Sequence, residues 1–528
     1  MKKFLFSLLS FASIFSSGVF ANGIGNLDWK PVQSCIELNQ HLSKFLKNHP
    51  QQKKLTPQAV FSPLLAGKSE EKSSELFFTT FDAEKKILML IQGPQAPQNP
   101  LINFTYAKKI AQLKLPKSFS EIQTLFFKDQ LFLLIAQEKL PNRDTATLIL
   151  IYELNQGKLS PLHVIRQSGS PRKVQLHKEK LYLITEEAVS EAKLKKIVEQ
   201  KMEVSEITPK LSEGLHYGLK MNEAKTLSCQ DLELRLGNEL PSFWTMLVLD
   251  LNRPDQNKQR MSFLGTFGDF FFSDDLLYTA TQEGNQTLIQ RFGLEPRLHY
   301  QKSELLTGEI LAGGIHTEGN ATSRITKSSS GKLHRYTQTQ FDSYFKEKEE
   351  RELLKGNENF DQADFLGKIP LLGSSNTFLL FPTETTNPIS LPKERNIQLF
   401  LLENTQLLKA EPEGNLTKLS QLSLKGGKLI ETKQDLLSGH FELQKGAVWN
   451  PTQHLLLLPI QDGEGNLLVK GLYISPAGNI KEQFTRRYTQ QGKAVEIRSF
   501  SDFNVVITDN LIDLFLSSAP RKMKVLKR

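Results

Sequence analysis

A hydrophobic run, a short polar turn and a second hydrophobic run recur as one unit along this chain. The clearest copies occupy residues 125–134, 174–184, 270–278 and 447–458. Each copy has the pattern of a β-hairpin, because two apolar strands flank a polar turn. The first two copies lie 50 residues apart, from Leu131 to Leu181. A hairpin repeated at this spacing is typical of a β-propeller, in which each blade is a small antiparallel sheet.

Longer apolar segments accompany these hairpins and complete the expected blades. Residues 147–154, 245–252 and 287–292 have the composition of strands buried between neighbouring blades. Hairpin centres near residues 85, 131, 181, 276, 333, 378, 455 and 505 predict an all-β propeller of about eight blades. The copies near 85, 333 and 378 are weak, so seven blades is the alternative.

Residues typical of tight turns recur between the predicted strands. The triplet Glu-Gly-Asn occurs at 283–285, 318–320, 413–415 and 464–466. Gly and Asn tolerate the positive φ angles that tight hairpins need, so each triplet predicts a turn. Residues 462–466 also resemble a calcium loop in their alternating oxygen ligands. We interpret them as a hairpin turn, since the later bidentate Glu of such a loop is missing.

One interval between hairpins is too long for a single blade. Leu181 and Leu276 are 95 residues apart, about twice one blade step. The excess, residues 186–240, contains a helical pattern at 190–202 with apolar residues on one side. We therefore expect a partly helical insertion that stands out from one face of the propeller.

A short helix is expected before the first blade. Ser34 and Glu37 form a capping-box pattern, and apolar residues follow at helical spacing up to residue 46. The only two cysteines of the chain are Cys35, at the start of this helix, and Cys229, near the end of the insertion. In an exported protein, two cysteines favour one disulfide, here a staple between helix and insertion. Two buried free thiols are the alternative.

The N-terminal residues indicate export. Two lysines, an apolar run at 4–20 and a small-residue site ending at Ala21 are typical of a signal peptide. We expect a signal peptide at 1–21, a helical segment at 22–55, a propeller at 56–516 and a basic tail at 517–528. The mature protein would be periplasmic or extracellular. No later segment is apolar and long enough to span a membrane.

Charge adds little beyond this. The formal net charge is +9, and the basic residues are scattered except in the tail at 521–528. The tail is expected to be a frayed terminus; contact with an anionic partner is the alternative. Scattered charge gives no reason to expect a nucleic-acid partner.

The chain resembles a family of secreted bacterial and archaeal proteins whose C-terminal β-propeller is distantly related to WD-repeat propellers. The segments that carry the resemblance are residues 34–38, 229–241, 245–252, 262–265, 272–278, 450–460 and 470–474. The resemblance implies the fold and export, and no particular reaction. The chain departs from the family at about 337–361, where a blade is shortened or rewritten. Residues 343–360 are dense in charge and are expected to form a solvated helix or loop.

Ring closure is the last structural expectation. Open sheet edges would pair with other chains, so the first and last blades should seal against each other. We expect the strands at 504–508 and 511–516 to pair with a first-blade strand at 76–81 or 87–91.

No local motif indicates catalysis. The chain has no His-Glu-x-x-His zinc motif, no nucleophile elbow and no phosphate-binding loop. We therefore assign no catalytic, metal-binding or cofactor-binding residue. The sequence favours a monomeric, non-catalytic platform that binds a protein or glycan of the cell envelope. The alternative is an exported hydrolase or lyase with its active site at the mouth of the propeller channel.

Overall fold

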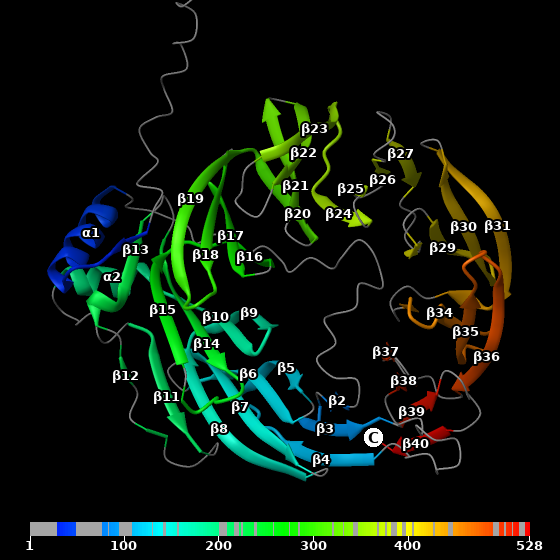
Figure 1. The fold of residues 1–528 in the computed structure, drawn as a ribbon, viewed down its shortest axis with the longest axis horizontal. Coiled ribbons are helices and arrows are strands. Elements are labelled where there is room, and N and C mark those ends of the chain that lie inside the picture. The colour runs from blue at the N-terminus through cyan, green and yellow to red at the C-terminus, as the bar shows by residue number, and fades with distance from the viewer. Residues whose placement is uncertain are drawn as a thin grey trace, which may run out of the picture.

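The computed structural model describes residues 29–48 and, with internal gaps, residues 77–527. The gaps longer than five residues are 94–107, 200–207, 382–387, 489–495 and 517–522. The described residues form antiparallel sheets that follow one another around a ring, with two α-helices on its outer side (Figure 1). The expected all-β propeller is confirmed.

Each blade consists of antiparallel strands that follow one another along the chain, except that the insertion separates β10 from β14 in blade 3. Blades 1 to 4 have the following strands: β2 (Phe77–Asp82), β3 (Ile87–Gln92) and β4 (Lys108–Lys114); β5 (Phe119–Phe127), β6 (Leu131–Lys139), β7 (Thr145–Asn155) and β8 (Lys158–Ser168); β9 (Ser170–His177), β10 (Lys180–Ala188), β14 (Ser242–Asp250) and β15 (Lys258–Gly265); β16 (Asp269–Ser273), β17 (Leu276–Glu283), β18 (Gln286–Gly293) and β19 (His299–Thr307).

Blades 5 to 9 continue the ring. Their strands are β20 (Glu309–Glu318), β21 (Ala321–Ser330), β22 (Leu333–Phe341) and β23 (Glu347–Gly356); β24 (Gln362–Leu366), β25 (Ile369–Gly373), β26 (Thr377–Leu380) and β27 (Ile389–Pro392); β28 (Gln398–Glu403), β29 (Gln406–Glu413), β30 (Leu416–Lys425) and β31 (Lys428–Ser438); β32 (His440–Phe441), β33 (Val448–Asn450), β34 (Leu455–Gln461), β35 (Leu467–Ile474) and β36 (Ile480–Tyr488); β37 (Glu496–Ser499), β38 (Phe503–Ile507), β39 (Leu511–Leu516) and β40 (Met523–Lys527).

The described strands make nine blades, so the expected eight, or seven, is wrong. The missed unit is blade 7, which lies between the hairpins expected near 378 and 455. Only two residues connect the strands of its first hairpin, β28 and β29. A connection this short gives few polar residues by which to recognise the repeat. The 77-residue interval from 378 to 455 holds one blade more than we expected.

The four hairpins read from the sequence are confirmed. Leu125 pairs with Leu133, Leu176 with Leu181, Phe272 with Leu277, and Trp449 with Leu456. The Glu-Gly-Asn triplets likewise join adjacent antiparallel strands. In the last of them, Asp462 Oδ1 accepts hydrogen bonds from the backbone amides of Glu464 and Asn466, at 3.0 and 2.8 Å. These bonds explain the acidic residue as part of the turn.

Blade 9 closes the ring by side-chain packing against blade 1. The expectation that its strands pair with a strand of blade 1 is wrong. β38 and β39 pair within their own sheet, and β40 supplies its fourth strand. Blades 1 and 9 meet through a buried cluster that includes Phe78, Ile91 and Phe503. One further link is a hydrogen bond of 2.9 Å from Arg498 Nη1 to the Thr79 carbonyl oxygen.

Two segments expected to be irregular are strands. The basic tail contributes β40, so the last blade extends beyond the expected end at residue 516. Residues 347–356 form β23, the outermost strand of blade 5, rather than a solvated helix or loop. Most residues at the start of β23 are exposed, because an outermost strand faces solvent. Its density of charge therefore reflects position in the blade.

A threonine–glycine contact recurs where one blade passes to the next. Thr147, Thr287 and Thr417 each donate from Oγ1 to the carbonyl oxygen of a glycine 21 or 22 residues later, at 2.7–2.8 Å. These glycines, Gly169, Gly308 and Gly439, have φ angles of 92°, 94° and 107°. Only glycine adopts this backbone conformation readily. The contact fixes the sharp turn from the outer strand of one blade to the inner strand of the next.

Ion pairs between repeated turns link blades 2, 3 and 4. Lys128 in the first turn pairs with Glu179 in the second, and Lys178 in the second pairs with Asp275 in the third. Both lysines have left-handed backbone conformations, with φ near 50°. Since these pairs are exposed, each contributes little to stability. They align successive blades at one end of the ring.

The insertion continues this part of the chain at the opposite end of blade 3. It begins after β10 and ends before β14, which pair directly with each other. It comprises α2 (Glu191–Val198), β11 (Lys210–Gly214), β12 (Lys225–Thr226), the short 3₁₀ turn η1 (Cys229–Asp231) and β13 (Leu232–Arg235). The N-terminal elements β1 (Lys30–Pro31) and α1 (Cys35–Asn48) pack with it. We call these elements together the cap.

Candidate binding surface on the outer rim

The cap lies along the outer rim of blades 2 and 3 (Figure 1), whereas we expected the insertion to stand out from one face of the propeller. β11 pairs with β8, the outermost strand of blade 2. β13 runs parallel to β15, the outermost strand of blade 3, and β1 pairs with β13. Outer strands present unpaired backbone groups, which the insertion satisfies by adding strands. Both sheets thereby grow to six strands.

Helix α1 begins where the capping pattern predicts. The Glu37 amide donates to Ser34 Oγ at 3.2 Å, and the Gln33 amide donates to a Glu37 carboxylate oxygen at 2.7 Å. These bonds satisfy amides that a helix cannot pair internally. Helix α2 has a similar N-terminal capping bond, since the Lys193 amide donates to Ser190 Oγ at 3.2 Å.

A dedicated hydrophobic core holds both helices to blade 3. Leu38 and Leu42 of α1 pack with Leu194 of α2 and with Phe243 and Leu264 of the blade. All five side chains are buried. A helix of this length is marginal in water by itself, so this core is what keeps α1 folded.

The predicted disulfide between Cys35 and Cys229 is present. Cys35 is the first residue of α1, and Cys229 is the first residue of η1. The bond joins residues 194 positions apart in the sequence. Such bonds persist in oxidising compartments. None of the helices in the described ranges is long and apolar enough to cross a membrane.

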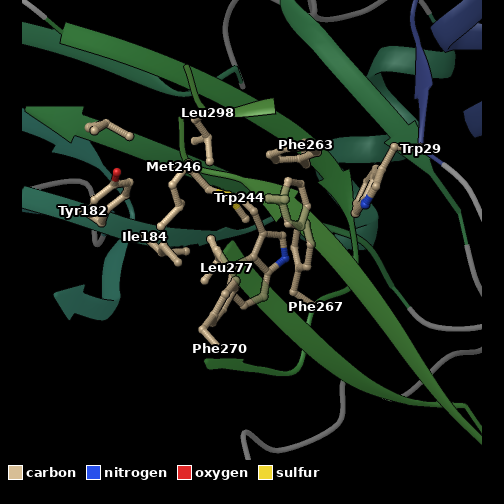
Figure 2. Packing of buried hydrophobic residues seen from close by; sticks show 13 residues of the cluster. Trp29, Tyr182, Ile184, Trp244, Met246, Phe263, Phe267, Phe270, Leu277 and Leu298 are labelled. Carbon is tan, nitrogen blue, oxygen red and sulfur yellow. The ribbon is translucent and has the colours of Figure 1, made fainter. Parts of the chain in front are cut away.

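Trp29 gives the N-terminal segment another anchor. Its ring lies 4.8 Å from the rings of both Phe263 and Phe267, measured between centroids. Figure 2 shows it at one end of the hydrophobic cluster that fills the seam between blades 3 and 4, beside Phe263 and Phe267, with Trp244 and Phe270 farther along. The segment before α1 is therefore held by an aromatic contact, by strand β1 and by the disulfide.

A polar cluster joins the cap to blades 2 and 3. Lys258 Nζ of β15 lies 2.6 Å from the Glu213 carboxylate of β11 and 3.1 Å from His163 Nε2 of β8. Burial, assisted by the Lys258 charge, lowers the pKa of His163. His163 therefore belongs to a contact on the outer rim in which burial favours its neutral form.

Two carboxylates mark the point where the insertion leaves blade 3. Glu186 accepts hydrogen bonds from Arg172 Nε, at 2.7 Å, and from Ser242 Oγ, also at 2.7 Å. Its neighbour Glu187 is half-buried, and its Oε2 atom has no hydrogen-bond partner. Burial raises the pKa of Glu187 to about 7, and the neighbouring charges of Lys193 and Asp144 act in opposite directions. This group titrates near neutrality.

A groove of about 460 Å³ lies on the outward side of α1. Ile36, Asn39, Ser43 and Lys47 line it from this helix, and Val198 lines it from α2. Ile36 is 73% exposed, the highest value among the large exposed hydrophobic side chains described. The groove is formed entirely by the cap.

A second cavity, of about 600 Å³, lies between blades 3 and 4 and is lined by Lys180, Lys258 and Arg297, among others. Lys180 already pairs with Glu295 at 2.8 Å, and Lys258 pairs with Glu213. In this cavity two of the cations are therefore neutralised by the protein itself.

The sequence analysis assigned no catalytic or metal-binding residue. In the described part of the chain, no three His, Cys, Asp or Glu side chains are grouped as a metal site would require. Among the described residues, four carboxyl groups have a pKa raised by burial, namely Glu187, Glu233, Asp269 and Asp513. They lie on β10, β13, β16 and β39, so Glu187 belongs to blade 3, Glu233 to the cap, Asp269 to blade 4 and Asp513 to blade 9.

Fold and rim together define a β-propeller with an elaborated outer edge. Residues 95–349 match the family model described as Beta propeller domain. A comparison with curated proteins finds no match. The resemblance expected from the sequence is thus confirmed for the propeller.

Solved structures with similar folds are distant. Hsv2 from Kluyvelomyces marxianus has 12% identity, covers 69% of this chain and 99% of its own, and gives a TM-score of 0.30. The β-propeller domain of the Trilobed protease from Pyrococcus furiosus has 8% identity, covering 71% and 95%, with a TM-score of 0.32. Pyrococcus horikoshii acylaminoacyl peptidase has 9% identity, covering 75% and 57%, with a TM-score of 0.31.

Proposed function

We propose that this protein is an exported, non-catalytic β-propeller that acts as a binding platform for a protein or glycan of the cell envelope. It works as a monomer in the periplasm or outside the cell. The observation that carries the proposal is the cap, in which several anchors hold a two-helix surface outward. A rigid scaffold that presents a fixed surface is well suited to recognition, because little order must be created on binding.

The chemistry of the described residues favours a platform over the hydrolase or lyase alternative. An active site at the channel mouth would require titratable groups with shifted pKa values to converge there. The blade carboxyl groups with raised pKa values are Glu187 in blade 3, Asp269 in blade 4 and Asp513 in blade 9, so they come from three different blades. Tyr488 donates a hydrogen bond of 2.7 Å to Asp513, so this carboxyl is engaged within the seam of blades 8 and 9.

Binding and turnover can be tested in one sample. Purified residues 22–528 are mixed with an isolated envelope fraction of the producing cell, and the bound protein is measured by sedimentation. The supernatant is assayed for released sugars and peptides. We expect saturable binding without release of soluble fragments. Catalysed release of either product would overturn the platform and establish the hydrolase or lyase instead.

A further inference from the structure

The groove on α1 changes chemical character along its length. Ile36 lies at one end, Asn39, Gln40 and Ser43 line the middle, and Lys44 and Lys47 lie at the other end. These positions recur at helical spacing, so they share one face of α1. Ile36 and Lys47 are eleven residues apart, which corresponds to about 16 Å along the helix axis.

Each part of the groove presents groups that need a partner. The Ile36 side chain is 73% exposed. In the middle of the groove, Asn39 Oδ1 is buried and has no hydrogen-bond partner. Within the described residues, neither Lys44 nor Lys47 forms an ion pair, unlike Lys180 and Lys258 in the cavity between blades 3 and 4.

We propose that this groove binds an extended acidic peptide segment of a partner protein. An apolar side chain of the peptide would contact Ile36 and Val198, and its carboxylates would pair with Lys44 and Lys47. The amide and hydroxyl groups between them would bond the peptide backbone. An extended chain rises about 3.3 Å per residue, so about five residues span the groove. This inference rests on the proposed function and names the class of ligand.

The lining argues for a peptide over a sugar chain. Protein sites for sugars commonly use aromatic rings as stacking surfaces, and none of the residues that line the groove is aromatic. An apolar end followed by amides and cations instead matches a side chain, a backbone and carboxylates in turn. The basic end attracts the acidic part of the ligand, which also speeds encounter.

The groove is held in place before any ligand arrives. Cys35, which precedes Ile36, is bonded to Cys229, and the inner face of the helix is buried in the cap core. A helix that is already ordered loses little entropy on binding. Reduction of the disulfide should therefore weaken binding without removing any lining residue.

The test measures fluorescence polarisation of a labelled peptide with residues 22–528. The probe has one leucine, three serines and three glutamates in that order, and its comparator has glutamines in place of the glutamates. We expect the acidic probe to bind more tightly, with a difference that shrinks as salt is added. Two exposed ion pairs correspond to about a fivefold change in Kd.

Variants locate the binding. The pair Lys44→Gln and Lys47→Gln should weaken the acidic probe about fivefold, and Ile36→Ser should weaken both probes. The matched control is Lys195→Gln with Lys196→Gln, which removes the same charge from α2 outside the groove lining. Lys47 also suits the C-terminal end of α1, so thermal melting is recorded for every variant.

The outcomes are decisive. Equal affinity for the two probes, equal effects of the two lysine pairs, or no binding at millimolar protein each overturns the proposal. A parallel arm uses vesicles of phosphatidylcholine mixed with phosphatidylserine, because clustered lysines are attracted to anionic lipid surfaces. Vesicle binding lost in the Lys44 and Lys47 variant, without peptide binding, would assign the groove to a membrane. If the protein binds the peptide but not the envelope fraction, the peptide-binding proposal is supported and the proposed function is refuted. If it binds the envelope fraction but not the peptide, the proposed function is supported and a surface other than the groove does the binding.

Discussion

Glu187 provides a direct test of how the insertion is joined to blade 3. Its carboxyl is enclosed near Ser168 of β8, Lys193 of α2 and Lys210 of β11, and Asp144 adds a further negative charge. One oxygen, Oε2, has no hydrogen-bond partner. Ionisation therefore places a poorly solvated charge at the base of the cap. We predict that Glu187→Gln stabilises the protein at alkaline pH.

The magnitude follows from the pKa. The ordinary value for this group is 4.5, and burial raises it to about 7. At about 1.4 kcal/mol per pKa unit, the difference corresponds to about 3 kcal/mol. The folded state holds the proton over a range where the unfolded state has lost it, so stability falls as the pH rises from 4.5 to about 7. Glutamine resembles the protonated form and removes that loss.

The assay is urea unfolding at pH 4.5 and pH 8, followed by tryptophan fluorescence, since Trp29 and Trp244 lie in the neighbouring seam. Glu187→Gln should match the wild type at pH 4.5 and gain up to about 3 kcal/mol at pH 8. Glu186→Gln is the matched control and should lose stability at pH 8, because Glu186 accepts hydrogen bonds from Arg172 and Ser242. An equal gain at both pH values, or a loss at pH 8, would refute the reasoning.

Two further predictions concern the turn between blades and the staple. Gly169→Ala places a Cβ atom 2.6 Å from the Glu186 carbonyl oxygen, whereas Gly414→Ala, also at positive φ, meets nothing within 4 Å; the first should cost about 1–3 kcal/mol more in urea unfolding, and equal costs would contradict the close contact. Replacing Cys35 and Cys229 by serine should lower stability by about 5 kcal/mol in the chain-entropy model and expose α1 first to limited proteolysis. Proteolysis that starts in a distant blade would contradict that role.

The propeller could be read from the sequence because its repeated hairpin combines apolar strands with polar turns, as at residues 125–134. Blade 7 was not predicted from the sequence because its first turn is short. Strands β23 and β40 were not predicted because outer strands face solvent. Such strands carry charge much as loops do, so composition alone cannot separate them. The prediction of ring closure was wrong for a different reason. The sequence indicates that the sheet edges must be covered, but side chains such as Phe503 can cover them without pairing between strands of the two blades.

The cap shows a similar limit. The disulfide and the start of α1 were predictable because Ser34, Cys35 and Glu37 are local signals. The groove was not, because which helix face is buried depends on where α1 docks. Ile36 and Leu38 are both apolar, yet one is 73% exposed and the other is fully buried. Only the packing against Leu194 and Phe243 distinguishes them.

The strands and the helices of the cap have different roles, and this difference bears on the function of the cap. Covering the outer edges of blades 2 and 3 requires strands, and β11 and β13 do this. The helices add nothing to those edges, and the outermost strand of blade 5, β23, carries exposed charges in place of a covering strand. An insertion that served the edges alone would need neither α1 nor its disulfide. The two helices, tied down on one side and open on the other, are therefore the part of the molecule that a role beyond stability must explain.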